Sequence, residues 1–116
     1  MITRPMTKDI LRAKISASSS GDNTIVSAVS DKRIRVLKVI LMSAGTVNAT
    51  FQSGAGGTAL TGAMPLIANI GFDSGYCPPE AGQFETGVGE LLNLSLSGAV
   101  GTFGWLIYVL EGGNNS

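Results

Sequence analysis

Hydrophobic and polar residues alternate along most of the chain with a period of two, the pattern of a β-strand with one buried face. In residues 11–17, for example, Leu, Ala, Ile and Ala occupy one side while Arg, Lys and Ser occupy the other. Short stretches rich in Gly, Ser, Asn and Pro separate such segments and are typical of turns and loops. The pattern therefore predicts strands at residues 11–17, 24–29, 33–42, 46–52, 58–61, 64–72, 84–88, 91–97 and 102–110.

These short strands follow one another without helices between them, which indicates a β-sandwich or a barrel. Residues 7–14 are the exception, because Ile10, Leu11 and Lys14 also fit a helical turn. We predict an all-β single domain, a jelly-roll-like antiparallel β-sandwich of about eight strands. An immunoglobulin-like sandwich is the alternative, but the chain lacks its Cys–Trp–Cys signature. The expected core consists of Ile15, Val47, Phe51, Leu92, Leu94, Leu96 and one face of residues 102–110.

The chain of 116 residues has the length of one domain. We expect the sandwich to occupy residues 10–111, between an N-terminal arm at residues 1–9 and a C-terminal tail at residues 112–116. The arm shows no strand alternation, and its Pro5 disfavours helix at the preceding residue. Two basic side chains of the arm, Arg4 and Lys8, are candidate contacts through which the arm docks on an acidic surface.

Two of the predicted strands are apolar on both faces. Residues 39–42 read Val-Ile-Leu-Met, and residues 102–110 carry Phe, Trp, Ile and Val on one face and Leu, Tyr and Leu on the other. A sandwich strand needs only one apolar face for its core, so a loop, a closed barrel or another subunit must cover the second. Closed cyclic symmetry is the common way for subunits to do so, and we expect a homotrimer. The candidate interface residues are Val39, Leu41, Leu106, Tyr108 and Leu110.

The composition argues against catalysis and against cofactor binding. The chain contains no His and a single Cys, Cys77, which excludes a Ser–His–Asp triad, an internal disulfide and a zinc cage of Cys and His. The glycine-rich residues 53–57 lack the Lys that a phosphate-binding loop requires. Glu80, Glu85 and Glu90 lie in a segment interrupted by Pro and Gly, so they share no helix face. We therefore expect no enzyme, no metal site and no cofactor.

The formal net charge is 0, but the charges are distributed unevenly. Residues 1–38 hold eight basic and three acidic residues, a net charge of +5, whereas residues 39–116 hold five acidic residues and no basic one, a net charge of −5. Because basic residues interleaved with aromatics are absent, nucleic acid is not an expected partner. The longest apolar runs, residues 39–42 and 105–110, are far shorter than a membrane span of ~18 residues. We expect neither a membrane segment nor a secretory signal.

Five stretches carry a resemblance to a known family: SASSSGDNTIVSAV at 16–29, RIRVLKVILM at 33–42, TVNATFQSG at 46–54, FET at 84–86 and GELLNLSLSG at 89–98. They resemble the small head-decoration, or cement, proteins of tailed bacteriophages. The resemblance implies a β-sandwich or jelly-roll subunit, usually trimeric, that sits on the outside of the head and bridges major capsid subunits. It implies no ligand residues, and the loop Cys77-Pro78-Pro79-Glu80 matches no pattern of the family.

The expected function is that of a non-enzymatic virion structural protein, made in the host cytoplasm and placed on the outer surface of the capsid. Its expected partners are the major capsid protein and further copies of itself. The alternative is a carbohydrate- or receptor-binding module of a phage tail or head fibre, because jelly rolls also serve as lectin domains. The candidate sugar site is the loop at residues 72–76, Phe-Asp-Ser-Gly-Tyr, in which aromatic side chains lie close to an Asp.

Overall fold

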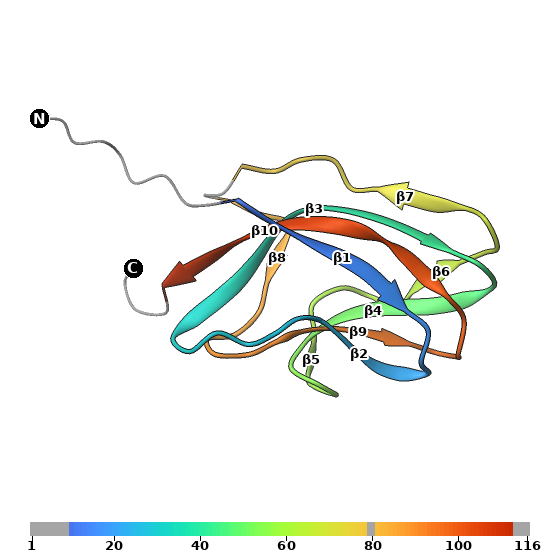
Figure 1. The fold of residues 1–116 in the computed structure, drawn as a ribbon, viewed down its shortest axis with the longest axis horizontal. Helices are drawn as coiled ribbons and strands as arrows, with labels where there is room; N and C mark the ends of the chain where they lie inside the picture. Colours follow the sequence, from blue (N-terminus) through green and yellow to red (C-terminus); the bar gives the residue numbers. More distant parts are fainter. Residues whose placement is uncertain (1–9, 79–80, 113–116) are drawn as a thin grey trace, which may run out of the picture.

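Two antiparallel β-sheets face each other in the computed structural model, which describes residues 10–78 and 81–112 (Figure 1). These residues contain no helix, and hence none long and apolar enough to cross a membrane. The all-β class predicted from the alternation is confirmed, and residues 11–14 belong to a strand and not to a helical turn. The strands are β1 (Leu11–Ala17), β2 (Gly21–Val26), β3 (Lys32–Ser43), β4 (Val47–Ser53), β5 (Thr58–Ala59), β6 (Met64–Leu66), β7 (Gly71–Asp73), β8 (Phe84–Glu85), β9 (Leu92–Leu96) and β10 (Thr102–Gly112).

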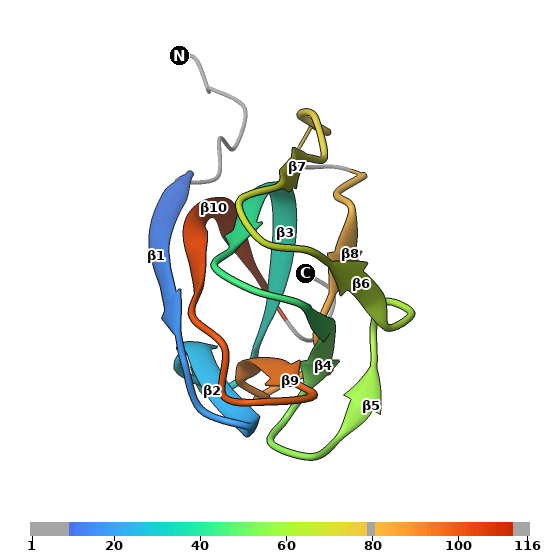
Figure 2. The same cartoon turned by 90° about the vertical axis from the view of Figure 1, so that its right-hand side faces the viewer.

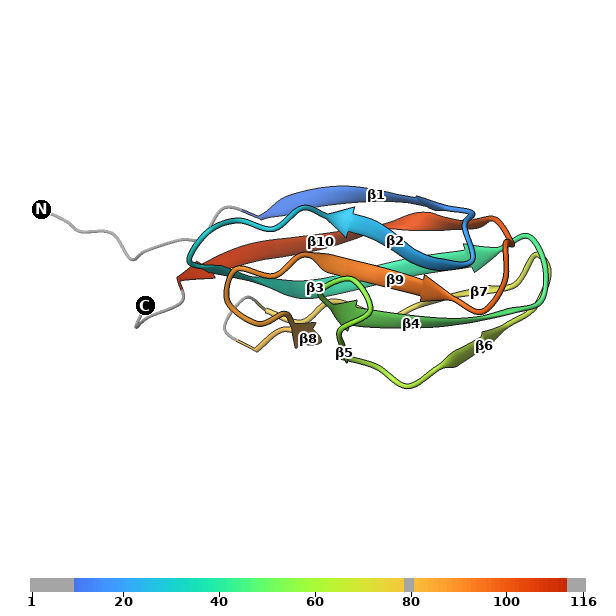
Figure 3. The same cartoon turned by 90° about the horizontal axis from the view of Figure 1, so that it is seen from below.

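The strands form two layers. Sheet A contains β1, β10 and β3 in that order, and both β7 and β8 pair with the far edge of β3. Sheet B contains β2, β9 and β4, and both β5 and β6 pair with the far edge of β4. An end-on view shows the two layers (Figure 2), and in the view from below β2, β9 and β4 lie side by side (Figure 3). The chain changes layer between β1 and β2, β3 and β4, and β9 and β10, so these consecutive strands lie in opposite sheets.

The hydrophobic core lies between the inner faces of the two sheets. Leu94 from sheet B is fully buried there, and Ile15 from sheet A is 1% exposed. Their strand neighbours Ser95 and Lys14 point to the outside, as the alternation predicts. The predicted core residues Ile15, Val47, Phe51, Leu92, Leu94 and Leu96 are all buried in one cluster, which confirms this part of the prediction.

Strand β2 begins three residues earlier than predicted, and the predicted turn at residues 18–23 is correspondingly shorter. Gly21 opens the strand with a left-handed φ of +85°. The Asn23 side-chain amide donates to the carbonyls of Ser19 and Gly21, at 2.9 and 3.1 Å. Asp22 and Asn23 nevertheless remain paired with β9 along their backbone. Asn23, a residue type that favours turns, thus lies inside the strand, because its side chain bonds back to the turn that precedes it.

The single strand predicted at residues 64–72 was wrong: the segment forms two short strands in different sheets. Strand β6 pairs with β4 in sheet B, whereas β7 pairs with β3 in sheet A. Between them Asn69 takes a left-handed φ of 63°, and its backbone N–H donates to the Ser43 carbonyl at 2.7 Å. The hydrophobic alternation continues through the point where the chain passes from sheet B to sheet A, so the sequence pattern alone does not reveal this change of sheet.

A β-bulge changes the phase of β3 relative to β10. The pairing passes from Lys38 directly to Val36, which leaves Leu37 as the extra residue of β3. Val36 and Val39 can therefore both face the core, although they are three positions apart and strict alternation would place them on opposite faces. Lys38 points to the outside, where its ammonium group lies 3.6 Å from the carboxylate of Asp73. The bulge thus decides which side chains of β3 form the outer face.

Candidate functional site: the outer face of sheet A

The outer face of sheet A is built from three rows of side chains that cross its strands. Residues that pair directly in an antiparallel sheet project from the same face, so the register defines each row. One row ends in a basic residue at β1 and in an acidic residue at β7. The rows are Arg12–Ile107–Lys38, Lys14–Trp105–Ile40–Asp73 and Ser16–Phe103–Met42–Gly71.

Apolar side chains occupy the middle of this face and are open to solvent. Met42 is 50% exposed, and Phe103, its partner across the strands, is 47% exposed. The segment between β6 and β7 adds Ile67 and Ile70, each more than half exposed. Large exposed apolar patches mark interaction sites, because monomeric proteins rarely expose them. We call the set Ile40, Met42, Ile67, Ile70, Phe103 and Trp105 the apolar patch.

Two open hollows link the parts of the apolar patch. One, of about 310 Å³, lies between β3 and β7, and the other, of about 290 Å³, lies against the segment that joins β6 to β7. Gly71 and Phe72 line both hollows. A Cβ atom at Gly71 would lie 2.1 Å from the Leu41 carbonyl oxygen, so only glycine lets β7 approach β3 this closely. The hollows are lined mainly by Ile40, Met42, Pro65, Leu66, Ile67 and Ile70 beside these shared residues.

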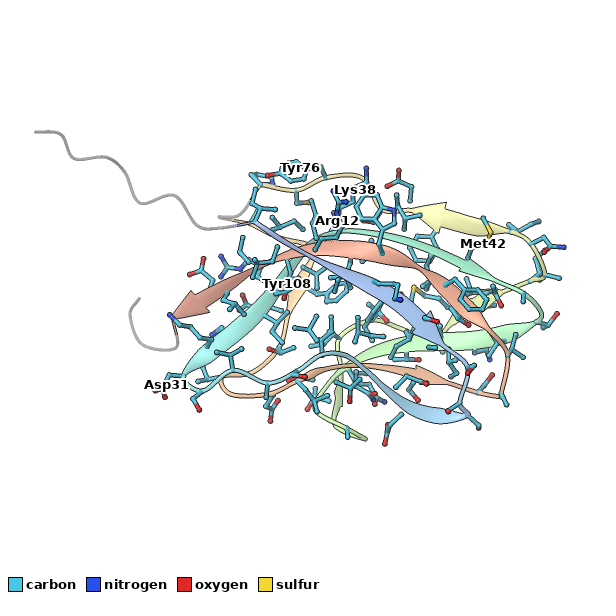
Figure 4. All side chains as sticks on the ribbon, viewed as in Figure 1. Arg12, Asp31, Lys38, Met42, Tyr76 and Tyr108 are labelled. Atoms are coloured by element: carbon cyan, nitrogen blue, oxygen red, sulfur yellow. The ribbon has the colours of Figure 1, made fainter. Side chains whose placement is uncertain are left out.

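The Trp105 ring contacts two cations, Arg12 and Lys38, which lie close together in Figure 4. The Arg12 guanidinium carbon is 5.2 Å from the centroid of the indole ring, and the Lys38 ammonium nitrogen is 5.7 Å from it. Cation–π contacts of this kind contribute roughly 0.5–1 kcal/mol each at exposed sites. Lys14, which pairs with Trp105 across β1 and β10, has no acidic partner among the described residues. The apolar patch therefore has a basic rim along β1.

Beyond the bulge, ion pairs cover the same sheet face. The Arg35 guanidinium lies 2.8 Å from a carboxylate oxygen of Glu85 and 3.0 Å from one of Glu111. Arg33 adds a longer contact to Glu85 at 3.7 Å. Gly82 packs flat on the Arg35 side chain, since a Cβ atom there would be 2.5 Å from the Arg35 Cγ. One end of the face is thus closed by paired charges, while the other end presents apolar groups.

The residues predicted from the sequence as a subunit interface lie elsewhere in the structure. Val39, Leu41 and Leu106 are at most 2% exposed and belong to the core, so the chain's own sheet B covers them. Tyr108 and Leu110 are half-buried and pack against the same core. This corrects the predicted interface: the inner and outer apolar faces of these two strands were exchanged.

The sequence contained a signal for the correct assignment at Lys38. A Lys is almost never buried without a partner, so Lys38 had to face outward. Further along β3, Ile40 and Met42 lie on the same side as Lys38, and Trp105 and Phe103 are their partners in β10. The prediction missed these outward residues because both faces of β3 and β10 are apolar, and alternation does not distinguish them.

Other predicted site residues are only partly accounted for by the structure. Arg4 and Lys8 lie outside the described residues, as do residues 113–116, while β10 ends at Gly112, the first residue of the predicted tail. Within the loop of unassigned role, the Cys77 thiol accepts a hydrogen bond from the Gln83 side-chain amide at 3.1 Å. The Cys77 backbone N–H also donates to the carbonyl of Leu37. These contacts attach the loop to β3 at the bulge.

The segment predicted as a sugar site begins in β7 and is open to solvent. Tyr76 is 53% exposed, and the Asp73 side chain is 54% exposed. One carboxylate oxygen of Asp73 accepts the backbone N–H of Gly75 at 2.9 Å, and the other faces Lys38. Both oxygens of Asp73 therefore have partners within the protein.

No cluster of three or more His, Cys, Asp or Glu side chains capable of holding a metal ion occurs in the part of the chain that the structure describes. Comparison of the chain with models of protein families, with curated proteins and with solved structures finds no match. The assignment of a function therefore rests on the residues and on the geometry of the outer face of sheet A.

Proposed function

We propose that the protein is a non-enzymatic structural subunit of a bacteriophage virion, which binds the outer surface of the head and bridges major capsid subunits. The observation that carries this proposal is the apolar patch on a sheet face rimmed by Arg12, Lys14 and Lys38, because such a surface is typical of a subunit that assembles with other protein chains. Aromatic, Met and Arg side chains are enriched at protein–protein interfaces, and a polar rim surrounds them there. The five stretches that resemble head-decoration proteins support the same function.

A jelly roll is the proposed topology of the sandwich. If β5 with β6 and β7 with β8 each count as one interrupted strand, each sheet contains four strands. The orders are then β1-β10-β3-β7/β8 and β2-β9-β4-β5/β6, so the first and last strands are neighbours, and consecutive strands change layer except from β4 to β5/β6. This order supports a double Greek key of eight strands.

The proposed assembled form is a homotrimer, made in the host cytoplasm and then added to the capsid. The apolar patch supports self-association, because a surface of this kind in a freely diffusing subunit favours non-specific aggregation. Light scattering at micromolar concentration then gives three times the chain mass of 11.9 kDa. A mass of one chain would contradict the trimer.

The copy number in purified particles tests the proposed location. In virions of the phage that encodes the chain, quantitative mass spectrometry should give a number of copies that matches the three-fold and quasi-three-fold positions of the head lattice. A cryo-EM map of the same particles should show the sandwich on the outer surface. Absence from the particle, or a few copies at a vertex or the tail, would contradict capsid decoration.

The N-terminal arm gives a prediction about capsid binding. A variant that begins at Asp9 removes Arg4 and Lys8 and should melt at the same temperature as the full chain, because β1 begins at Leu11. It should bind undecorated heads more weakly, because assembled shells commonly expose acidic surface and a segment that becomes ordered on a partner adds contact area there. The matched control is the full chain with Arg4→Gln and Lys8→Gln, which separates the charges from the length of the arm. Unchanged head binding of the shortened chain would overturn the docking role.

A receptor-binding function is the second candidate, and the exposure of Tyr76 beside Asp73 favours it. Exposed aromatic rings stack on sugar rings, and carboxylates accept hydrogen bonds from sugar hydroxyls. Binding of the chain to surface polysaccharide of the host, lost in Tyr76→Ala, would support this function. No binding, together with a lattice-matched copy number, would exclude it.

A further inference from the structure

The central row of the outer face carries opposite charges at its two ends. Lys14 lies at one end, on the edge strand β1, and Asp73 lies at the other, on β7. Trp105 and Ile40 separate them in the middle of the row. The two ends are three strand spacings apart, about 14 Å, so the two charges do not neutralise each other within one chain.

We propose that a second copy of this chain covers the apolar patch in a head-to-tail contact, with Lys14 of one copy against Asp73 of the next. This inference rests on the proposed self-assembly and names the surface and the direction of the contact. Each copy then offers a basic edge at β1 and an acidic group at β7. Such a contact joins two different surfaces, and it repeats around an axis until the ring closes.

The charges favour this direction over a symmetric pairing of edges. If β1 of one copy lay beside β1 of another, Arg12 and Lys14 of both copies would come together without an acidic group of β1 to compensate them. Like charges placed opposite each other are destabilising. In the head-to-tail contact the same two cations approach Asp73, whose side chain is 54% exposed and therefore accessible to a second cation besides Lys38.

The exposure of the apolar patch favours a second copy of the chain, and not the capsid, as the protein that covers it. Met42 and Phe103 are exposed in the free chain, which exists before it meets a capsid. A surface of this kind must be covered while the subunit is in solution, whereas a capsid contact forms later. Head-to-tail packing brings the apolar middles of the rows together around the common axis, where they are removed from water.

Two matched substitutions test whether the patch is the contact. Phe103→Asp places a charge in the patch and should weaken self-association on the order of 100-fold, since hot-spot residues of an interface have effects of this size. Val88→Asp is the control, because Val88 is 42% exposed but lies in the segment between β8 and β9, away from the rows. Both variants should retain the circular dichroism spectrum and melting temperature of the monomeric fold. Equal self-association of the two variants would overturn the inference.

A charge exchange tests the direction of the contact. Lys14→Glu and Asp73→Lys should each weaken self-association, by roughly 5-fold per contact, the range of exposed ion pairs. The chain that carries both substitutions should recover it, because the new carboxylate at position 14 of one copy then faces the new ammonium group at position 73 of the next. Positions 14 and 73 of one chain are three strand spacings apart, so recovery cannot arise from a pair within one chain. Additive weakening in the double variant would overturn the head-to-tail direction.

The measurements separate this inference from the proposed function. A trimer whose stability follows the Lys14–Asp73 exchange would support the contact, whereas a dimer would contradict both the trimer and the head-to-tail direction, because a two-fold contact joins the same surface of both copies. A wild-type chain that is monomeric, and whose Phe103→Asp variant fails to bind undecorated heads, would overturn the inference and retain capsid decoration through this same face. Sedimentation velocity for the first outcome and co-sedimentation with heads for the second give independent readouts.

Discussion

The outer faces of the two sheets differ in whether their side chains have partners within the chain. On sheet B, Asn93 is fully buried although it lies on the outer side of β9. Its amide nitrogen donates to Asp22 at 2.9 Å and to Gln52 at 2.8 Å, and its oxygen accepts the backbone N–H of Asn23 at 2.8 Å. On sheet A, the outer face carries the exposed apolar side chains of Met42 and Phe103 next to the half-buried Ile40 and Trp105. The polar groups of the first face find their partners within one chain, whereas the second face leaves Met42 and Phe103 open to solvent.

The loop that follows β4 strengthens this contrast. The backbone N–H of Gly56 donates to the Asp22 carboxylate at 3.1 Å, which draws the loop over the outer side of sheet B. Hydrogen bonds are directional, so they determine how β2, β9 and β4 are aligned. Apolar contacts are not directional, and on sheet A the alignment of a partner would instead depend on the charges at the ends of the rows.

Leu94→Ala should have the largest effect on stability, because it damages the core that supports both faces. Leu94 is fully buried between the sheets, and removal of such a side chain destabilises a protein by about 2–5 kcal/mol. Urea unfolding followed by circular dichroism measures the change. Ser95→Ala on the adjacent, outward position is the control, with an expected change below about 0.5 kcal/mol. A neutral Leu94→Ala would contradict the assignment of the core.

Asn93→Ala should have the next largest effect and should act on sheet B alone. The substitution leaves the backbone N–H of Asn23 and two side-chain acceptors without this partner, which costs about 1–3 kcal/mol. The association constant of the folded chains should be unchanged, because the contact proposed for sheet A lies on the opposite side of the sandwich. Asn48→Ala, on an exposed position of β4, is the control. Equal stability of the two variants would show that the network of Asn93 does not close this face.

Arg35→Ala should have the smallest effect on stability of the three substitutions. It tests the difference, within sheet A, between the end of the outer face with ion pairs and the end with apolar side chains. Its guanidinium pairs with Glu85, whose side chain is 36% exposed, and with Glu111, whose side chain is 13% exposed. Solvent screens the first pair more than the second, and we expect a loss of about 1 kcal/mol. The difference from wild type should shrink as salt is added, because the pairs are partly open to water. Arg33→Ala, which loses only the contact at 3.7 Å, should change stability less. An equal loss at low and high salt would point to packing of the Arg35 side chain on Gly82.

Much of the fold could be predicted from alternation. Strands β1, β3, β4, β9 and β10 lie within one or two residues of their predicted positions, and the predicted core residues are buried. These strands pair with neighbours along most of their length and face the core on one side, so burial imposes a period of two on their sequence. The short strands β5 to β8 were predicted less well, because two or three paired residues are too few to show a period.

The candidate site could not be predicted in the same way. Val39 and Leu41 were assigned to an outer face, and the structure places them in the core. Ile40 and Met42 are also apolar, so alternation does not show which of the two pairs faces inward, and the local signal at Lys38 was not used. A single extra residue, Leu37, determines the outcome, since a one-residue shift in a strand exchanges its two faces.

The sequence by itself determined that the chain folds as an all-β domain with strands at the positions where polar and apolar residues alternate, because a half-buried strand requires that period. It also determined the chemistry available, since the absence of His and the presence of a single Cys are properties of the composition. Only the tertiary structure decided which strands share a sheet and which apolar face lies outside. Those features depend on contacts between residues far apart in the chain, such as the pairing of Lys14 with Trp105 and of Ile40 with Asp73, and local patterns contain no information about them.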